Sequence, residues 1–203
     1  DGLTAVALLG PKTDQLLKRG DEDVKDQTWR EFRATAPAES LYHHLSMNFD
    51  AQGRLIKRFR QLLLIKTPEG ARRLRRQEVT LHPTRHELTL ESARIWRETS
   101  SGYTSRPPLS RSQKSLSEPA YRLYYDLIAE VIDFGPLRSG EVIELAWKLR
   151  ETQPDPQGIN AHGEWFAFDS RIPRHEVVLE LGPTAIKRLH TQLSKNTLSL
   201  EHL

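Results

Sequence analysis

Short segments in which apolar and polar residues alternate fill most of the chain between Leu41 and Leu181, and this alternation constrains the fold more than any other feature. Successive side chains of a strand point to opposite faces of a sheet, so the alternation predicts strands with one apolar face. It is most regular at Tyr121–Val131 and Ile143–Leu149. Turn residues such as those of Asp50–Gly53 separate the segments. We therefore predict an all-β fold, an antiparallel β-sandwich.

The predicted strands follow one another with short connections. Thr67–Gly70 is interpreted as a turn, and Ser100–Pro119, with seven serines and three prolines, as a long Ser/Pro-rich surface loop. Helical spacing near the termini favours short helices within Gln15–Phe32 and Ala185–Leu193. The last two strands are expected to pair as antiparallel neighbours. In order, the predicted strands are Leu41–Phe49, Arg54–Ile65, Arg72–Leu81, His86–Trp96, Tyr121–Val131, Ile143–Leu149, Trp165–Asp169 and Arg174–Leu181.

The chain of 203 residues is long enough for one large β domain. Residues 41–203 are expected to form a sandwich accessory domain, with residues 1–40 as either an N-terminal extension or its first strands. A net charge of +3 is too small to indicate a nucleic-acid-binding protein. Because the chain has no cysteine, disulfides, thiolate metal sites and cysteine nucleophiles are excluded. No apolar run is long enough to span a bilayer, and the residues that follow Asp1 do not have the basic and apolar pattern of a leader peptide.

Histidine pairs are the only hint of a metal site, and their positions argue against one. Pro83 lies between His82 and His86, which favours a turn rather than a helix that would place both rings on one face. His43 and His44 are adjacent on a strand and should point to opposite faces. We expect neither a metal nor any other cofactor.

The motifs of common enzyme classes are missing. No G-x-S-x-G elbow, Walker-type phosphate loop or G-x-G-x-x-G segment occurs, so the chain is expected not to be an enzyme. Paired carboxylates would leave a glycosidase-like hydrolase as the alternative. These acids, which fall mostly on the polar side of the predicted strands and are expected in solvent, are Asp126, Glu130, Glu141 and Glu144.

Basic residues cluster on two successive predicted strands. If the strands were neighbours, the side chains would form a surface for phosphate, anionic glycan or an acidic partner, although cations also protect exposed strands. The candidate binding residues are Arg54, Lys57, Arg58, Arg60, Arg72, Arg73, Arg75 and Arg76. Trp96, Trp147 and Trp165 could form a sugar platform, but their positions within strands favour core packing.

The order of several stretches resembles a bacterial domain of unknown function that directly precedes transglutaminase-like domains. The resemblance covers about two thirds of the chain, and residues 1–40 do not share it. The stretches that carry it are Asn48–Arg54, Tyr124–Leu127, Phe134–Leu145, Trp165–Phe168 and Ile172–Val177.

The resemblance implies a fold and a setting but transfers no catalytic residue. In such proteins the following transglutaminase-like domain would carry a Cys-His-Asp site, and some contain tetratricopeptide repeats. We therefore expect a non-catalytic accessory or scaffold domain of a larger bacterial protein, in contact with a transglutaminase-like domain or another protein. The alternative is a module that binds glycan or another anionic polymer through the surface Arg54–Arg76. The resemblance favours an extracytoplasmic location in the cell envelope.

Overall fold

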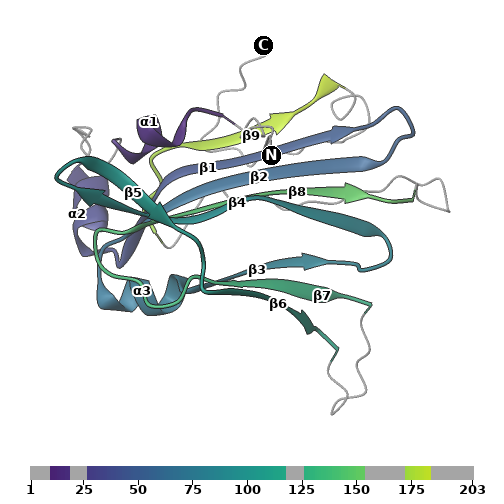
Figure 1. The fold of residues 1–203 in the computed structure, drawn as a ribbon. Coiled ribbons are helices and arrows are strands. Elements are labelled where there is room, and N and C mark those ends of the chain that lie inside the picture. Colours follow the sequence, from purple (N-terminus) through teal and green to yellow (C-terminus); the bar gives the residue numbers. More distant parts are fainter. Residues whose placement is uncertain (1–9, 19–26, 118–125, 154–171, 184–203) are drawn as a thin grey trace.

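The computed structural model describes residues 10–18, 27–117, 126–153 and 172–183. Two sheets lie one against the other, and short helices sit at one end (Figure 1). The helices are α1 (Thr13–Leu17), α2 (Gln27–Thr35) and α3 (Pro68–Leu74). The strands are β1 (Ala38–Phe49), β2 (Leu55–Ile65), β3 (Arg76–Leu81), β4 (His86–Thr99), β5 (Gly102–Arg106), β6 (Ser110–Ser115), β7 (Ile128–Asp133), β8 (Val142–Glu151) and β9 (Val177–Leu181).

The large sheet has the strand order β5-β4-β8-β2-β1-β9, and the small sheet has the order β3-β7-β6. Neighbouring strands are antiparallel except β1 and β9. The predicted all-β sandwich, with short helices near the N-terminus, is therefore confirmed. Within the described ranges, no helix has the length and apolar character that a bilayer-spanning helix requires.

The predicted hairpin between β1 and β2 is present, and its turn residues explain its geometry. Asp50 Oδ1 accepts hydrogen bonds from the backbone N–H groups of Gln52 and Arg54, both at 3.0 Å. Gly53 adopts a φ of 79°, a conformation that residues with a Cβ rarely take. The turn fixes the register in which Phe49 faces Leu55.

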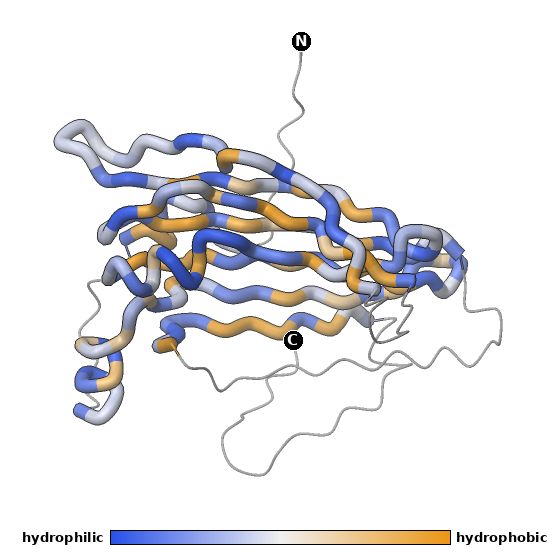
Figure 2. Tube along the Cα trace, turned by 90° about the horizontal axis from the view of Figure 1, so that it is seen from below, coloured by the Kyte–Doolittle hydropathy of each residue, from blue (hydrophilic) through white to orange (hydrophobic). Residues whose placement is uncertain are grey.

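The main core lies between the inner faces of the two sheets. Leu63, Ile143 and Ile95 stand side by side on β2, β8 and β4 of the large sheet. They belong to the same apolar cluster as Ile132 and Phe134 of the small-sheet side. Figure 2 shows the resulting alternation of hydrophobic and hydrophilic positions along the strands. Strand parity therefore predicted which face of the large sheet meets the small sheet.

The segment 67–81 differs from its prediction. Instead of a turn followed by a strand from Arg72, the chain forms α3, and β3 begins only at Arg76. Thr67 caps the helix by accepting a hydrogen bond from Gly70 N at 3.1 Å, and Pro68 occupies the first turn. Threonine before proline is a common helix start, so the local sequence carried a helix signal that the turn interpretation overlooked.

The predicted loop 100–119 is also wrong in part, because β5 and β6 lie within it. All six residues of β6 are exposed, so the strand has no apolar alternation to reveal it. The C-terminal strand β9 runs parallel to β1. Its predicted antiparallel pairing with Trp165–Asp169 stays a prediction, because that partner segment is not among the described residues. The predicted strand Trp165–Asp169 and helix Ala185–Leu193 lie outside the described residues.

Gly70→Ala should destabilise the protein by about 1–3 kcal/mol because α3 packs on the chain before β1. A Cβ on Gly70 would lie 2.1 Å from the Pro37 carbonyl oxygen, which also accepts hydrogen bonds from Lys66 N and Thr67 N. The backbone would have to move. Urea unfolding should detect the loss, with the exposed Arg72→Ala of the same helix as control. Equal stability of the two variants would contradict the close approach.

Candidate functional site: the Arg60 cluster

The outer face of the large sheet, which points away from the small sheet, carries polar side chains in its centre. His44, Arg60 and Ala146 are aligned across β1, β2 and β8. In the next row of the same face, Tyr42 and Glu144 flank Leu62. We call Thr13, Tyr42, Arg60, Trp96 and Glu144 the Arg60 cluster.

A fully buried ion pair forms the centre of the cluster. The side chains of Arg60 and Glu144 are 0% and 1% exposed. Arg60 Nε and Nη2 both donate to Glu144 Oε1, at 3.1 and 2.8 Å. Burying two charges costs free energy unless their remaining hydrogen-bonding positions are also satisfied. The neighbouring residues satisfy them.

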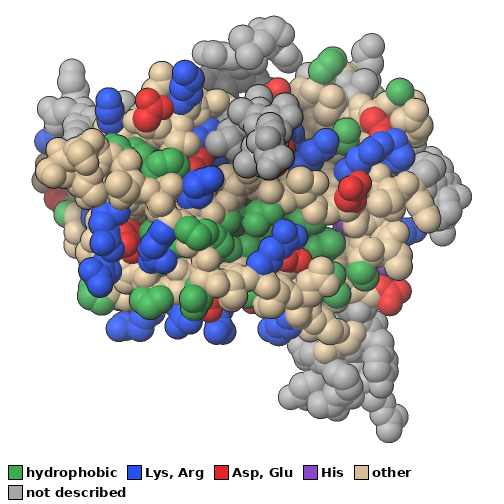
Figure 3. Space-filling model, viewed as in Figure 1, with side chains coloured by type: hydrophobic (Ala, Val, Ile, Leu, Met, Phe, Trp, Pro, Cys, Tyr) green, Lys and Arg blue, Asp and Glu red, His purple; other side chains and the backbone are tan. Residues whose placement is uncertain are grey.

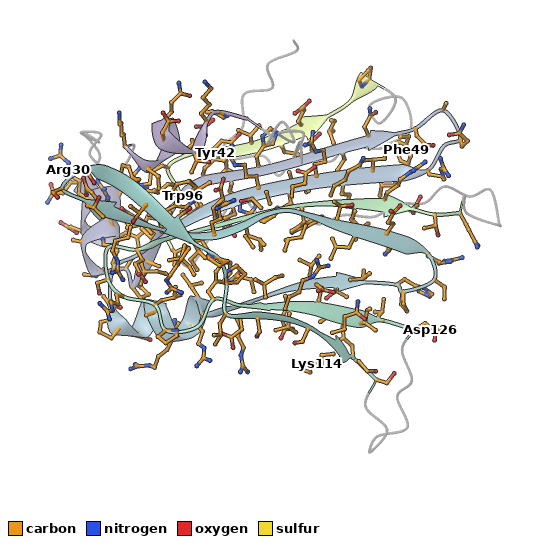
Figure 4. All side chains as sticks on the ribbon, in the orientation of Figure 1. Arg30, Tyr42, Phe49, Trp96, Lys114 and Asp126 are labelled. Atoms are coloured by element: carbon orange, nitrogen blue, oxygen red, sulfur yellow. The ribbon has the colours of Figure 1, made fainter. Side chains whose placement is uncertain are left out.

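Pro11 and Thr13, just before and at the start of α1, cover the cluster on the side that faces away from the sheet. Arg60 Nη1 donates to the Pro11 carbonyl, and Nη2 donates to Thr13 Oγ1 at 2.8 Å. Thr13 Oγ1 in turn donates to Glu144 Oε1 at 3.0 Å, and Trp96 Nε1 donates to Glu144 Oε2 at 2.9 Å. Tyr42 and Trp96 lie at the α1 end of the large sheet (Figure 4). The pair is thus buried beneath the N-terminal segment.

A hydrogen-bonded chain runs from the cluster to the sheet edge. Tyr42 Oη and His44 Nδ1 are 2.8 Å apart, and His44 Nε2 lies 3.2 Å from Glu180 Oε2 on β9. Burial lowers the pKa of His44, although Glu180 opposes this effect. We infer a neutral imidazole that accepts from Tyr42 and donates to Glu180. The Tyr42 hydroxyl itself is buried, so the chain is closed at that end.

A second charged pair lies one row further along the same face. Arg58 donates to Glu91 through two nitrogens: Nε donates to Oε1 at 3.2 Å, and Nη2 donates to Oε1 at 2.9 Å and to Oε2 at 3.1 Å. Glu91 sits where the register between β4 and β8 shifts, between Leu90 and Ser92. A bulge of this kind changes the direction of a side chain. Here it supplies the carboxylate that neutralises Arg58.

The eight predicted basic residues do not form one surface, because β2 and β3 belong to different sheets. Arg54 pairs with Asp50, and Lys57 lies on the opposite side of β2 from Arg58 and Arg60. Arg60 is buried rather than exposed. Arg72 and Arg73 lie on α3, and Arg75 and Arg76 both bind Asp133. Their role in binding remains a prediction, but the adjacency on which it rested is wrong.

The prediction that the four acids lie in solvent is wrong for three of them. Glu130, Glu141 and Glu144 are all buried, whereas Asp126, two residues before β7, is exposed (Figure 4). Each buried acid has an arginine partner: Arg111 for Glu130, Arg97 for Glu141 and Arg60 for Glu144. Glu130 lies on the inner face of the small sheet, in register with Val79.

His43, His44 and Trp147 lie on the faces of the large sheet that strand geometry predicted. His43 contacts Phe59 on the inner side, whereas His44 contacts Tyr42 on the outer side. Across the described ranges, no group of three or more histidines and acids is arranged to hold a metal ion. Trp147 stacks on Phe59 with ring centroids 5.2 Å apart and packs against the core. Trp165 lies outside the described residues.

Sequence reasoning missed Thr13, Tyr42 and Glu91 as parts of a polar site. The sequence of β1 contained an indication of this site. Tyr42, His44 and Ser46 are polar residues at every second position, and Leu45, Met47 and Phe49 lie on the other face of the strand. What alternation could not reveal was that the N-terminal segment covers this face. Chemically, the arrangement binds a backbone carbonyl and a hydroxyl group through Arg60, and it holds no free acid and base facing a common space.

Tyr42→Phe should lower the free energy of unfolding by about 1–2 kcal/mol, because it leaves buried His44 Nδ1 without its partner. Tyr103→Phe removes a hydroxyl from the same apolar cluster, but that hydroxyl makes a 3.4 Å contact with the Leu17 carbonyl and the residue is partly exposed. Its loss should cost less than half as much. Thermal unfolding should separate the two, and a larger effect at Tyr103 would contradict the role of the His44 chain.

Comparisons with known proteins place the chain in a family but do not assign an activity. No curated protein matches it. A solved structure described as a putative protease from Parabacteroides distasonis aligns with 58% of this chain at 18% identity and a TM-score of 0.48. The aligned part is 24% of that longer chain. The model of a "Domain of Unknown Function with solved-structure structure (DUF3857)" matches residues 51–197. This match extends over more than half of the sequence, so the chain belongs to the DUF3857 family.

Proposed function

We propose that the chain is a non-catalytic accessory domain of a larger bacterial protein and that it contacts a neighbouring domain. The transglutaminase-like domain implied by the sequence resemblance is the partner we propose, in the cell envelope. The observation that carries the proposal is an incompletely covered apolar surface on the inner face of the large sheet. We call it the β4 band, and it consists of Phe59, Leu88, Leu90, Ala93 and Trp147.

The residues of the β4 band pack against the core but remain only partly buried. In Figure 3, hydrophobic side chains gather in a band across the middle of the molecule, with Lys and Arg side chains above and below it. An apolar centre with a charged rim is the usual composition of a protein interface. A folded neighbour with an apolar surface of its own would complete the burial.

The pairing of the buried carboxyl groups with arginines supports a role without catalysis. A general acid at neutral pH needs a raised pKa. Hydrogen bonds from Arg75 lower the pKa of Asp133 despite an opposing effect of burial. Glu130, Glu141 and Glu144 are each bound by arginine. Hydrolysis of a polysaccharide or a peptide by the purified chain, lost in Glu130→Gln, would contradict this part of the proposal.

Footprinting by hydroxyl radicals tests the contact. In the longer protein that includes the neighbouring domain, Leu88, Leu90 and Trp147 should be protected relative to this chain alone. Leu90→Lys should remove that protection, whereas Thr89→Lys, on the opposite face of β4, should leave it intact. Equal reactivity of the β4 band in the two proteins would overturn the proposal.

A second candidate is binding of an anionic polymer by the arginines of α3 and β3. Arg72 is exposed, and the side chains of Arg73 and Arg76 are 64% and 65% exposed. Titration with a sulfated polysaccharide at physiological salt tests it. Arg72→Glu with Arg73→Glu should weaken binding at least about tenfold, whereas Arg54→Glu on the distant hairpin should not. Absence of binding by the unmodified chain would exclude this candidate.

A further inference from the structure

The N-terminal segment 10–17 lies on the outer face of the large sheet in the manner of a bound peptide. Its described contacts are made mostly by side chains, and it adds no strand to the sheet. Thr13, Leu16 and Leu17 are spaced i, i+3 and i+4, so they lie on one face of α1. This spacing is the one by which short helices anchor in grooves of other proteins.

The surface beneath the segment has a polar part and an apolar part. In the polar part, Arg60 donates to the Pro11 carbonyl and to Thr13 Oγ1, and Glu144 accepts from the same hydroxyl group. The hydroxyl is therefore recognised both as acceptor and as donor. A valine or an alanine at position 13 would leave two buried charged groups with unsatisfied hydrogen bonds.

In the apolar part, Leu16 is 0% exposed and Leu17 is 7% exposed. They pack with side chains from five strands: Leu41, Tyr42, Leu62, Trp96, Tyr103 and Val142. A close contact of Gly10 with Tyr42 fixes the start of the segment, since a Cβ on Gly10 would lie 2.0 Å from Tyr42 Oη. The surface thus distinguishes three features of its occupant: a small residue, a hydroxyl and a pair of leucines.

We propose that this surface is a peptide-binding site which residues 10–17 occupy as an intramolecular ligand. Its external partner is a peptide segment of another protein or domain that carries a hydroxyl side chain followed, one helical turn later, by two leucines. Such a peptide displaces the N-terminal segment and takes over its contacts with Arg60, Glu144 and the apolar pocket. The site lies on the opposite face of the sheet from the β4 band, so it is independent of the proposed partner domain.

An external peptide must compete with the chain's own segment 10–17 for the site, and this competition determines the affinity that we expect for the peptide. A segment on the same chain has an effective concentration in the millimolar range, so an external peptide binds weakly while that segment is intact. Weakening the segment removes the competitor. A full-length Thr13→Ala, Leu16→Asp variant should therefore bind a fluorescent peptide of residues 10–18 at least about tenfold more tightly than the unmodified chain.

Fluorescence anisotropy measures this binding, and the control is the same peptide with Thr13→Val and Leu16→Asp. The indole N–H of Trp96 donates to Glu144, so its NMR resonance reports the state of the site. It should shift in the variant and return when the unaltered peptide binds. Binding of both peptides with equal affinity, or binding that leaves the Trp96 resonance shifted, would overturn the proposal.

A second measurement covers the case in which the variant does not fold. Because the chain contains no cysteine, Lys12→Cys gives one exposed position for a spin label beside α1. The label should move slowly in the otherwise unmodified chain and faster when unlabelled peptide of residues 10–18 is added at millimolar concentration. Unchanged mobility at that concentration would show that the segment is a permanent part of the fold, and the proposal would fail.

Discussion

Arg60→Met should lower the free energy of unfolding by about 3–5 kcal/mol, the loss typical when one partner of a buried ion pair is removed. Glu144 would remain in a buried site, where Thr13 and Trp96 are the remaining donors among the described residues. The carboxylate would have to take up a proton or the segment over it would have to open. For a chain of this size, a loss of that order lowers the midpoint of thermal unfolding by roughly 6–20 °C.

The double variant Arg60→Met, Glu144→Leu distinguishes two contributions to the free energy of unfolding: the penalty for burying an unpaired charge and the net stabilisation by the ion pair. Replacing both partners with apolar residues removes the buried charge, so the double variant should recover much of the stability lost in Arg60→Met. Recovery should be incomplete, because the Pro11 carbonyl and the indole N–H of Trp96 lose their partners. A double-mutant cycle from urea unfolding measures the coupling.

Arg73→Met is the matched control for these variants. Arg73 pairs with Glu69 on α3, but the two side chains are 64% and 50% exposed. Solvent weakens such a pair, and its loss should change stability by less than about 1 kcal/mol. If Arg60→Met were as stable as Arg73→Met, the Arg60 cluster could not be a closed site, and its description as the anchor of the N-terminal segment would be wrong.

The contrast between Trp147 and Glu144 shows what strand alternation can predict and what it cannot. Alternation placed Trp147 on the core side of β8, and the side chain stacks there on Phe59. The same rule correctly placed Glu144 on the opposite side of β8. Alternation alone, however, could not predict that Glu144 is buried. It depends on Thr13, which is 131 residues away in the sequence. Alternation along a strand predicts on which face of the sheet each side chain lies, but it does not predict whether another segment covers that face.

Local signals failed for different reasons in α3 and β6. At α3, two interpretations competed, since Thr-Pro-Glu-Gly suits both a turn and a capped helix start. The helix formed, with Gly70 fitting closely against the Pro37 carbonyl. At β6, every side chain is exposed, and hydrogen bonding to β7 defines the strand. A strand with two exposed faces shows no alternation of apolar and polar residues in the sequence, so β6 could be recognised only from the tertiary structure.

Acidification should remove a contribution of about 3 kcal/mol that Glu39 makes to stability at neutral pH. Burial would raise the pKa of Glu39, but the opposing contacts with His175 and Arg33 lower it from 4.5 to about 2. The side chain is 1% exposed, and Arg33 Nε lies 2.8 Å from Oε2. His175 Nε2 lies 3.6 Å from the same oxygen, and Lys66 Nζ lies 4.0 Å from it.

The direction of the pH dependence follows from the lowered pKa. As the pH falls, the unfolded chain protonates Glu39 first, so protons favour unfolding. The contribution is complete above about pH 5 and is lost progressively as the pH falls through 4.5 toward 2. Urea unfolding at pH 7, 5 and 3 should therefore show the stability difference between the unmodified protein and Glu39→Gln shrinking as the pH falls.

Glu69→Gln provides the control, because Glu69 is half exposed and pairs with Arg73 at the surface. Its effect should be small at every pH. Comparing variants at the same pH cancels the titration of other groups, Asp133 among them, whose pKa is also lowered. A difference between Glu39→Gln and the unmodified protein that stays constant from pH 7 to pH 3 would contradict the assignment. Stability would then depend on the shape of the Glu39 side chain rather than on its charge.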